Sequence, residues 1–134
     1  MNKNKFLALL FPIIALILEL LPNGVTMHFK APPGEPPFIT HTSYFDLLPL
    51  GYANFAPIFT AILTIILLIT LLLYVVKGTP KLWKTSKIVS LVAVILSLCP
   101  MIFSSYTLIG GLISISLFAE FLYLVLKKSS NTKK

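Results

Sequence analysis

Four long apolar runs constrain the fold of this chain more than any other feature. They cover residues 6–22, 56–76, 88–103 and 106–126. The second and fourth reach the roughly 20 residues that a helix needs to cross a bilayer, and the first and third are shorter. Because 57% of the residues are hydrophobic and only 11% are charged, a water-soluble core could not enclose these runs. The sequence therefore predicts an all-α membrane protein, a single bundle of four transmembrane helices.

The positions of the lysines predict the orientation of this bundle. All eleven basic residues are Lys, and only Lys30 falls in the long loop 23–55. The others precede the first run, lie in the loop 77–87, or belong to the tail 127–134. Because the cytoplasmic flanks of spanning helices collect Lys, both termini and the loop 77–87 are expected in the cytoplasm. We therefore expect a multi-pass protein of the cell membrane, with the loop 23–55 outside.

The first run has one alternative interpretation, a cleaved signal peptide, because a basic start precedes its apolar middle. A cleavage site requires small residues after the apolar stretch. Glu19, Leu20 and Leu21 occupy that place here. We therefore expect the run 6–22 to be retained as a spanning helix.

The outer loop 23–55 contains two stretches that alternate apolar and polar residues, 25–30 and 38–44. A connection rich in proline, 31–37, separates them. Two β-prone stretches around such a connection predict a β-hairpin, although two strands alone are marginal in water. An irregular loop stiffened by proline is the alternative. The aromatic residues of the stretch 43–55 predict a short interfacial helix before the second span.

Four side chains of this loop are candidates for contacts with a partner: His28, His41, Tyr44 and Asp46. Histidine and acidic side chains also ligate metals, and facing strands could bring the two histidines together. The loop lacks the tight spacing of established zinc motifs, so we expect solvated histidines, no metal and no cofactor. Ser43 and Asp46 have the spacing of a helix capping box, and Asn54 is expected to cap the second span.

Two of the four acidic residues fall within apolar runs. Glu120 lies roughly 10 Å inward from Lys127, which marks the end of the fourth run. Ser116 and Tyr123 are about one turn away on either side, so the three are expected to form a polar stripe that faces other helices. Such an acid is a candidate ion or substrate site, and a polar contact between helices is the alternative. Glu19 lies near the outer end of the first run, where water is expected to reach it.

The layout resembles that of the claudins, with four spans, termini inside, a large first outer loop with β-prone stretches and a short second one. The claudin loop also carries a tryptophan and a pair of cysteines, which the loop 23–55 lacks. This likeness is one of architecture and implies no barrier function. The stretch from Tyr44-Phe45-Asp46 to Asn54-Phe55, with the Lys-only and Ile-rich composition, is similar to uncharacterised small four-helix membrane proteins of low-GC Gram-positive bacteria. That resemblance implies a bacterial membrane protein and supplies no activity.

These observations predict an accessory or interaction subunit that docks a partner through its outer loop. The alternative is a small transporter or channel that uses Glu120 and is oligomeric, because one four-helix bundle leaves little room for a pore. The spans show no Ser/His/Asp set, so we expect no enzymatic activity. The expected partners are the lipid bilayer and another membrane protein or a second copy. Nucleic acid is not expected, because the basic residues flank apolar runs instead of forming one water-facing surface.

Overall fold

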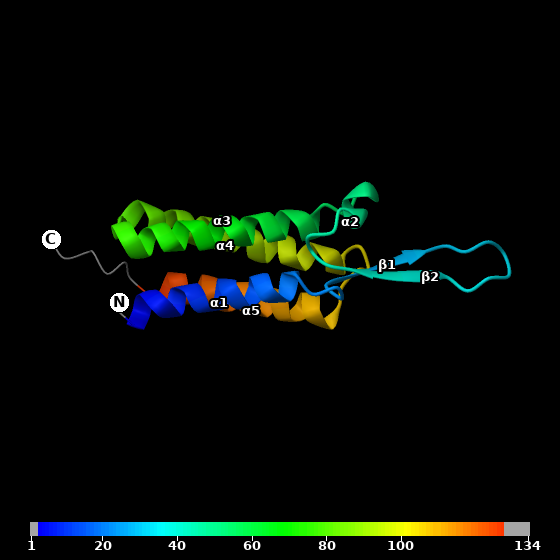
Figure 1. The fold of residues 1–134 in the computed structure, drawn as a ribbon, viewed down its shortest axis with the longest axis horizontal. Helices are drawn as coiled ribbons and strands as arrows, with labels where there is room; N and C mark the ends of the chain where they lie inside the picture. Colours follow the sequence, from blue (N-terminus) through cyan, green and yellow to red (C-terminus); the bar gives the residue numbers. More distant parts are fainter. Residues whose placement is uncertain (1–2, 128–134) are drawn as a thin grey trace.

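A computed structural model describes residues 3–127 of the chain. Four long helices run side by side, and each is antiparallel to the one before it (Figure 1). They are α1 (Lys3–Glu19), α3 (Ala56–Lys77), α4 (Pro80–Leu98) and α5 (Leu108–Leu126). Helix α1 packs on α3, α3 on α4, α4 on α5 and α5 on α1, so the four close into a ring. Of the expected tail 127–134, only Lys127 belongs to the described residues.

Within the described part of the chain, three helical segments are long and apolar enough to cross a membrane. They are Ala56–Lys77, Pro80–Met101 and Leu108–Leu126. By length and composition, these helices support the prediction of a multi-pass membrane protein for the second, third and fourth runs. Helix α1 ends at Glu19 and has 17 residues, so it is shorter than these three. It nevertheless lies along the bundle beside α3 and α5 (Figure 1).

The loop predicted at 77–87 is mostly helical, which corrects the boundary expected for the third run. Gly78 ends α3 in the left-handed conformation, with φ of 65°, and Pro80 occupies the first turn of α4. Glycine after the last turn and proline at the start are the residues that such helix ends favour. Three lysines that suggested a loop belong to α4: Lys81 and Lys84 are exposed and Lys87 is partly buried, while Trp83 and Ser86 are buried. The connection is therefore only Gly78 and Thr79.

The hairpin predicted in the outer loop is confirmed. Strands β1 (Val25–Phe29) and β2 (Phe38–Thr42) pair antiparallel, with Val25 opposite Thr42 and Phe29 opposite Phe38. The hairpin projects from one end of the bundle, which we call the hairpin end (Figure 1). The short helix α2 (Leu48–Gly51) lies at the same end, and the short helix η1 (Cys99–Met101) follows α4 there. We call the opposite end, where α1 starts and α5 finishes, the lysine end.

The bundle exposes apolar side chains on its outside and holds several polar groups among the apolar side chains of its interior. Large apolar side chains are exposed on the outer faces of all four helices, including Ile17, Ile69, Ile95 and Ile115. The buried polar side chains include Thr60 and Thr64 on α3, Ser86, Ser90 and Ser97 on α4, and Ser114 and Glu120 on α5. Soluble proteins rarely expose such continuous apolar surfaces, so this surface suits contact with lipid.

Candidate functional site

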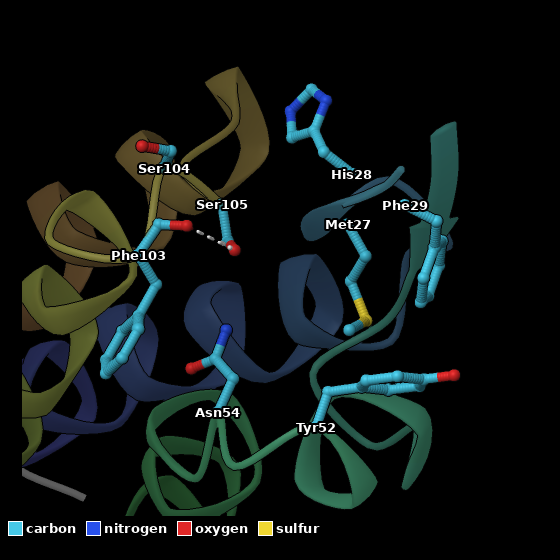
Figure 2. Close-up of a pocket in the computed structure, with 8 residues that line it drawn as sticks. All are labelled: Met27, His28, Phe29, Tyr52, Asn54, Phe103, Ser104 and Ser105. Atoms are coloured by element: carbon cyan, nitrogen blue, oxygen red, sulfur yellow. Dashed lines mark hydrogen bonds between the residues drawn. The ribbon is translucent and has the colours of Figure 1, made fainter. Parts of the chain in front are cut away.

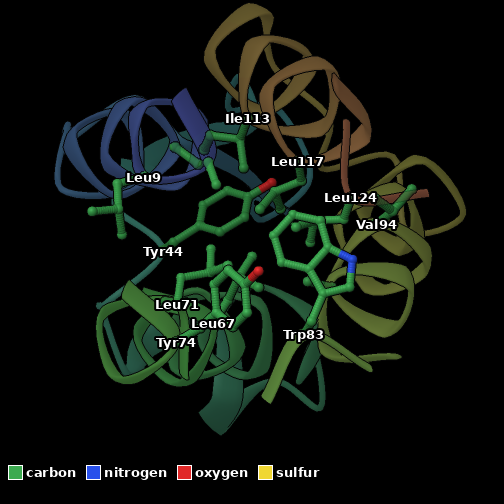
Figure 3. Close-up of a cluster of buried hydrophobic side chains, with 14 of the residues drawn as sticks. Leu9, Tyr44, Leu67, Leu71, Tyr74, Trp83, Val94, Ile113, Leu117 and Leu124 are labelled. Carbon is green, nitrogen blue, oxygen red and sulfur yellow. The ribbon is translucent and has the colours of Figure 1, made fainter. Parts of the chain in front are cut away.

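Tyr44 closes the hairpin end of the bundle. Its side chain is fully buried, and its ring lies between the helices rather than on the surface (Figure 3). Its backbone amide donates a hydrogen bond to the carbonyl of Glu19, at 3.1 Å. Burial raises the pKa of the Tyr44 phenol, and Glu19 and Tyr106 add to this rise. Tyr44, predicted as a surface contact, is therefore a buried residue that fills the space between the helices at this end; we call its side chain the plug.

Two glycines make room for this plug. A Cβ atom on Gly24 would lie 2.9 Å from Cδ1 of Tyr44, closer than packed side chains allow. A Cβ atom on Gly110 would lie 3.3 Å from the Tyr44 hydroxyl and 3.2 Å from the carbonyl oxygen of Gly24. A side chain on Gly24 would force Tyr44 to shift, and one on Gly110 would require its neighbours to give way by a few tenths of an ångström. The loop therefore sits against α5 at a fixed depth.

Hydrogen bonds strap the base of the hairpin to the turn between α4 and α5. The Thr107 hydroxyl donates to the carbonyl of Gly24 at 2.8 Å and accepts from the amide of Gly110 at 3.0 Å. The amide of Thr26, in β1, donates to the carbonyl of Ser105 at 3.2 Å. The bonds from Thr107 to Gly24 and from Thr26 to Ser105 link residues that are about 80 positions apart in the chain. They hold β1 beside the α4–α5 turn, where the two elements enclose a pocket.

This pocket, which we call the hairpin pocket, has a volume of about 360 Å³. It lies between β1, the connection from α2 to α3, and the α4–α5 turn (Figure 2). Its walls are largely apolar and aromatic, and Phe29 packs edge-on against Tyr52 with ring centroids 4.9 Å apart. The residues that line it are Met27, His28, Phe29, Tyr52, Asn54, Phe103, Ser104 and Ser105.

Asn54 supplies the pocket with a buried amide. Its side chain is only 5% exposed, and neither its oxygen nor its nitrogen has a hydrogen-bond partner among residues 3–127. Figure 2 shows this amide pointing into the space beneath Ser105 and Met27. The prediction that Asn54 caps α3 is wrong, because Phe55 is the N-cap residue of this helix and no side chain caps it. A buried amide without partners costs about 1–3 kcal/mol, which a bound polar group would recover.

The backbone is strained on both sides of this pocket. Ala53, next to Asn54, has φ of 63°, and Ser104, in the pocket wall, has φ of 52°. No other non-glycine residue in the described chain has a positive φ. Hydrogen bonds hold both turns, including Asn54 N–H to the Pro49 carbonyl at 2.9 Å and Ser105 N–H to the Pro100 carbonyl at 3.0 Å. Such strain is found most often at functional sites, where the surrounding structure sustains it.

The remaining loop candidates have different environments. Asp46 is exposed, and its carboxylate accepts a hydrogen bond from the amide of Leu48 at 2.9 Å, at the start of α2. His28 lies opposite Ile39, and His41 lies opposite Thr26, so the histidines are diagonal neighbours on one face of the hairpin. His41 Nδ1 is 3.1 Å from the Thr26 hydroxyl.

Within the described residues, no group of three or more side chains of His, Cys, Asp or Glu could hold a metal.

Glu19 is fully buried, so the prediction that water reaches it is wrong. Its Oε1 atom accepts a hydrogen bond of 2.7 Å from the Thr64 hydroxyl, and Thr64 also lies 3.0 Å from the carbonyl of Thr60. Glu19 is buried, and not exposed to water as predicted, because Tyr44 packs next to it at the end of α1. A residue near the end of a helix becomes buried when a distant segment packs over it.

Glu120 is also fully buried, and neither of its oxygens has a partner in the described structure. It shares the buried face of α5 with Ile113, Leu117 and Leu124. Of the predicted polar stripe, Tyr123 lies within electrostatic range of Glu120, and the Ser116 hydroxyl donates to the carbonyl of Leu112 on its own helix at 2.9 Å. Both Ser116 and Tyr123 are partly buried. Glu120 is thus a buried acid without a hydrogen-bond partner in the described structure, in the half of the bundle near the lysine end.

No family model, curated protein or solved structure matches this chain. The function must therefore be inferred from the geometry alone. Of the residues that line the hairpin pocket, sequence reasoning named His28 as a candidate and missed the others as site residues, above all Asn54, Phe103 and Ser104. The only signal in the sequence is that Tyr52–Asn54 and Ser104–Ser105 both occupy short polar breaks between apolar runs. Nothing in the sequence shows that these breaks meet.

Proposed function

We propose that this protein is an accessory subunit of the cell membrane that docks a partner at its hairpin end. The observation that carries the proposal is the hairpin pocket, where apolar walls surround a buried amide with no partner among residues 3–127. Apolar pockets with a few converging polar groups are the usual form of a binding site. The strained turns that frame this pocket and the straps that fix the hairpin support the same function, since both keep the site formed in advance.

In this proposal α1 also crosses the membrane, so that it adds a fourth span to α3, α4 and α5. Its 17 residues extend roughly 26 Å, and the apolar turn after Glu19 adds to this length. Its outer face exposes Phe6, Ile13 and Ile17, as a surface in lipid would. At its start, the Lys5 ammonium donates to the carbonyl of Val75 near the end of α3, at 3.4 Å. Helix α1 therefore belongs to the same layer of the bundle as the longer spans.

The orientation follows from the lysines. Lys5, Lys77, Lys81 and Lys127 lie at or near the helix ends that form the lysine end of the bundle (Figure 1). Because Lys-rich flanks stay in the cytoplasm, both termini belong inside and the hairpin pocket faces outward. A partner would then meet the protein outside the cell membrane or at its outer surface.

The packing of the bundle favours docking over transport by a single copy. Large side chains, including Tyr44, Leu67, Leu71 and Leu117, fill the axis between the four helices (Figure 3). The described residues line two pockets at the hairpin end, one of them the hairpin pocket. The interior therefore serves to hold the spans together, and the pocket offers the surface that a partner can enter.

Photocrosslinking in intact cells tests this proposal. A benzophenone amino acid would replace Tyr52 or Phe103 at the pocket, and Ile69 on the lipid-facing side of α3 as the control. We expect both pocket positions to form an adduct with the same protein and the control position to form none. The adducts should also disappear when Asn54→Leu is added. The proposal fails if the pocket positions yield no common adduct, or if Ile69 yields it equally.

A second function, an oligomeric transporter or channel, is favoured by one observation. Glu120 is a fully buried acid without a partner among the described residues, and acids at such depth often mark ion pathways. This function predicts that Glu120→Gln abolishes ion flux in liposomes while the protein still folds. The docking function predicts no flux with either side chain, and unchanged photocrosslinking in Glu120→Gln.

A further inference from the structure

We propose that the hairpin pocket binds an extended polypeptide segment that adds a third strand to the edge of β1 and inserts a carboxamide side chain, such as that of Gln, against Asn54. This inference rests on the proposed docking function and names the chemistry of the partner. Three features support it: the direction of the backbone groups of β1, the position of Ser105, and the composition of the pocket.

The register of the hairpin shows which backbone groups of β1 face outward. Thr26 pairs with His41, yet its amide donates to Ser105 and therefore points away from β2. In an antiparallel pair, alternate residues direct both backbone groups toward the partner strand, and the residues between them direct both away. His28, two positions after Thr26, therefore presents its amide and carbonyl on the open edge of β1.

The carbonyl of Ser105 lies where a third strand beside β1 would place one of its carbonyls. It accepts the hydrogen bond from Thr26, and Ser105 and His28 both line the hairpin pocket. An extended chain placed beyond Ser105 would continue this pairing and meet the backbone of His28. Adding a strand to an exposed sheet edge is an established way of binding peptides, because the main-chain bonds supply affinity and a pocket beside the edge supplies specificity.

The pocket beside this edge fits a side chain with an apolar stem and a terminal amide. Strand alternation directs Met27 and Phe29 toward Asn54, whereas the imidazole of His28 points away from it (Figure 2). The stem would pack on Met27 and on the rings of Phe29 and Tyr52. A carboxamide has one donor and one acceptor side by side, as Asn54 does, so the two can exchange a pair of hydrogen bonds.

The size of the pocket agrees with a single inserted side chain. About 360 Å³ lies at the small end of the range of ligand pockets. The backbone donor and acceptor on the strand edge favour a polypeptide over a lipid headgroup, since a headgroup does not carry a donor and an acceptor at the spacing of a paired strand. Binding of a headgroup is nevertheless a distinct outcome of the experiment below.

The experiment uses the full chain in lipid nanodiscs and two pools of synthetic peptides. The peptides of both pools are five residues long, with capped ends and randomised non-ionic flanking residues. The central residue is Gln in one pool and Met in the other. NMR signals from the His28 backbone amide and the Asn54 side-chain amide report binding. We expect saturable shifts of both signals with the Gln pool and about tenfold or more weaker binding with the Met pool, because Met leaves Asn54 unpaired.

Two controls separate the site from its surroundings. Asn54→Leu should reduce binding of the Gln pool to the level of the Met pool, whereas Asn23→Leu, at an exposed asparagine outside this pocket, should leave it unchanged. A Gln pool whose central residue and its two neighbours are N-methylated on the backbone should bind about tenfold or more weakly, because it cannot pair with the strand edge. Equal binding of the Gln, Met and N-methylated pools, or no binding at millimolar concentration, would overturn the inference.

The outcomes also distinguish this inference from the proposed function. If a common adduct forms at Tyr52 and Phe103 but the peptide pools do not bind, the docking function stands and the strand-edge chemistry is wrong. If the pools bind as expected but no adduct forms, the site binds peptides and the docking function in the cell is wrong. If changing the nanodisc lipid from phosphatidylcholine to phosphatidylglycerol produces the same saturable shifts, the pocket holds a headgroup and the inference is wrong.

Discussion

Each half of the bundle contains a buried acid, but only the acid at the hairpin end has a hydrogen-bond partner in the described structure. At the hairpin end, Glu19 accepts a hydrogen bond from Thr64 and is covered by Tyr44. Toward the lysine end, Glu120 is equally buried but has no partner in the described structure. The partner of Glu19 lies on α3, and the outer loop folds back over this end of the bundle, whereas α3 and α4 are joined by only two residues, Gly78 and Thr79. The two ends of the bundle therefore differ in that a long loop packs over only one of them.

The largest expected effect tests whether the loop organises the hairpin end. Tyr44→Ala should lower the free energy of unfolding by about 3–5 kcal/mol, because it removes a large, fully buried ring. Tyr44→Phe is the matched control and should cost little, since the Tyr44 hydroxyl has no partner within residues 3–127. Unfolding of the purified protein in mixed micelles by SDS titration measures both. A large loss in Tyr44→Phe would show that the hydroxyl has a role that the packing does not account for.

The next prediction concerns the partnered acid. Thr64→Val keeps the shape of the side chain but removes the donor to Glu19, and should cost about 1–3 kcal/mol because a buried carboxyl loses its partner. Ser90→Ala, at a buried hydroxyl without a partner in the described part of the chain, is the control toward the lysine end. The same SDS titration should place Ser90→Ala within about 0.5 kcal/mol of the wild type. Equal losses in the two variants would remove the contrast between the ends.

The unpartnered acid should respond in the opposite direction. Glu120→Leu should leave stability unchanged or raise it by about 1 kcal/mol or more, because a buried polar group without partners is replaced by an apolar one of similar size. Glu19→Leu should not gain in this way, because it also removes the hydrogen bond with Thr64. Clear destabilisation by Glu120→Leu would mean that this acid has a partner in the membrane, such as a second copy or an ion.

These contrasts show how far the sequence could predict the molecule. The apolar runs at 56–76 and 106–126 agree closely with α3 and α5, and the alternating stretches around 31–37 correctly predicted the hairpin. Local patterns determine these elements, because periodicity and turn residues act within a few positions. The start of α4 was missed because its exposed lysines resembled a loop, although Gly78 and Pro80 marked the helix ends.

The site depended on contacts that no local pattern contains. The hairpin pocket forms where Tyr52 and Asn54 meet Phe103 and Ser104, about 50 positions further along the chain. The burial of Glu19 likewise depends on Tyr44, which reaches it only because the loop returns to the bundle. His28, a candidate from the sequence, lines the hairpin pocket, but its side chain points away from Asn54 (Figure 2). Its residue type alone could not have shown this.

The smallest expected effect tests whether strain at the hairpin end is part of the site. Ala53→Gly should raise the free energy of unfolding by about 0.5–1 kcal/mol, because glycine adopts the left-handed conformation at φ of 63° without a steric penalty. Part of this gain is offset by the greater freedom of glycine in the unfolded chain. Gly51→Ala is the matched control, since a Cβ atom there meets nothing within 4 Å and no left-handed φ is relieved. If the strain maintains the pocket, Ala53→Gly should also bind the Gln peptide pool more weakly although it is more stable. A variant that is more stable and binds equally well would show that the strained turn only connects α2 to α3.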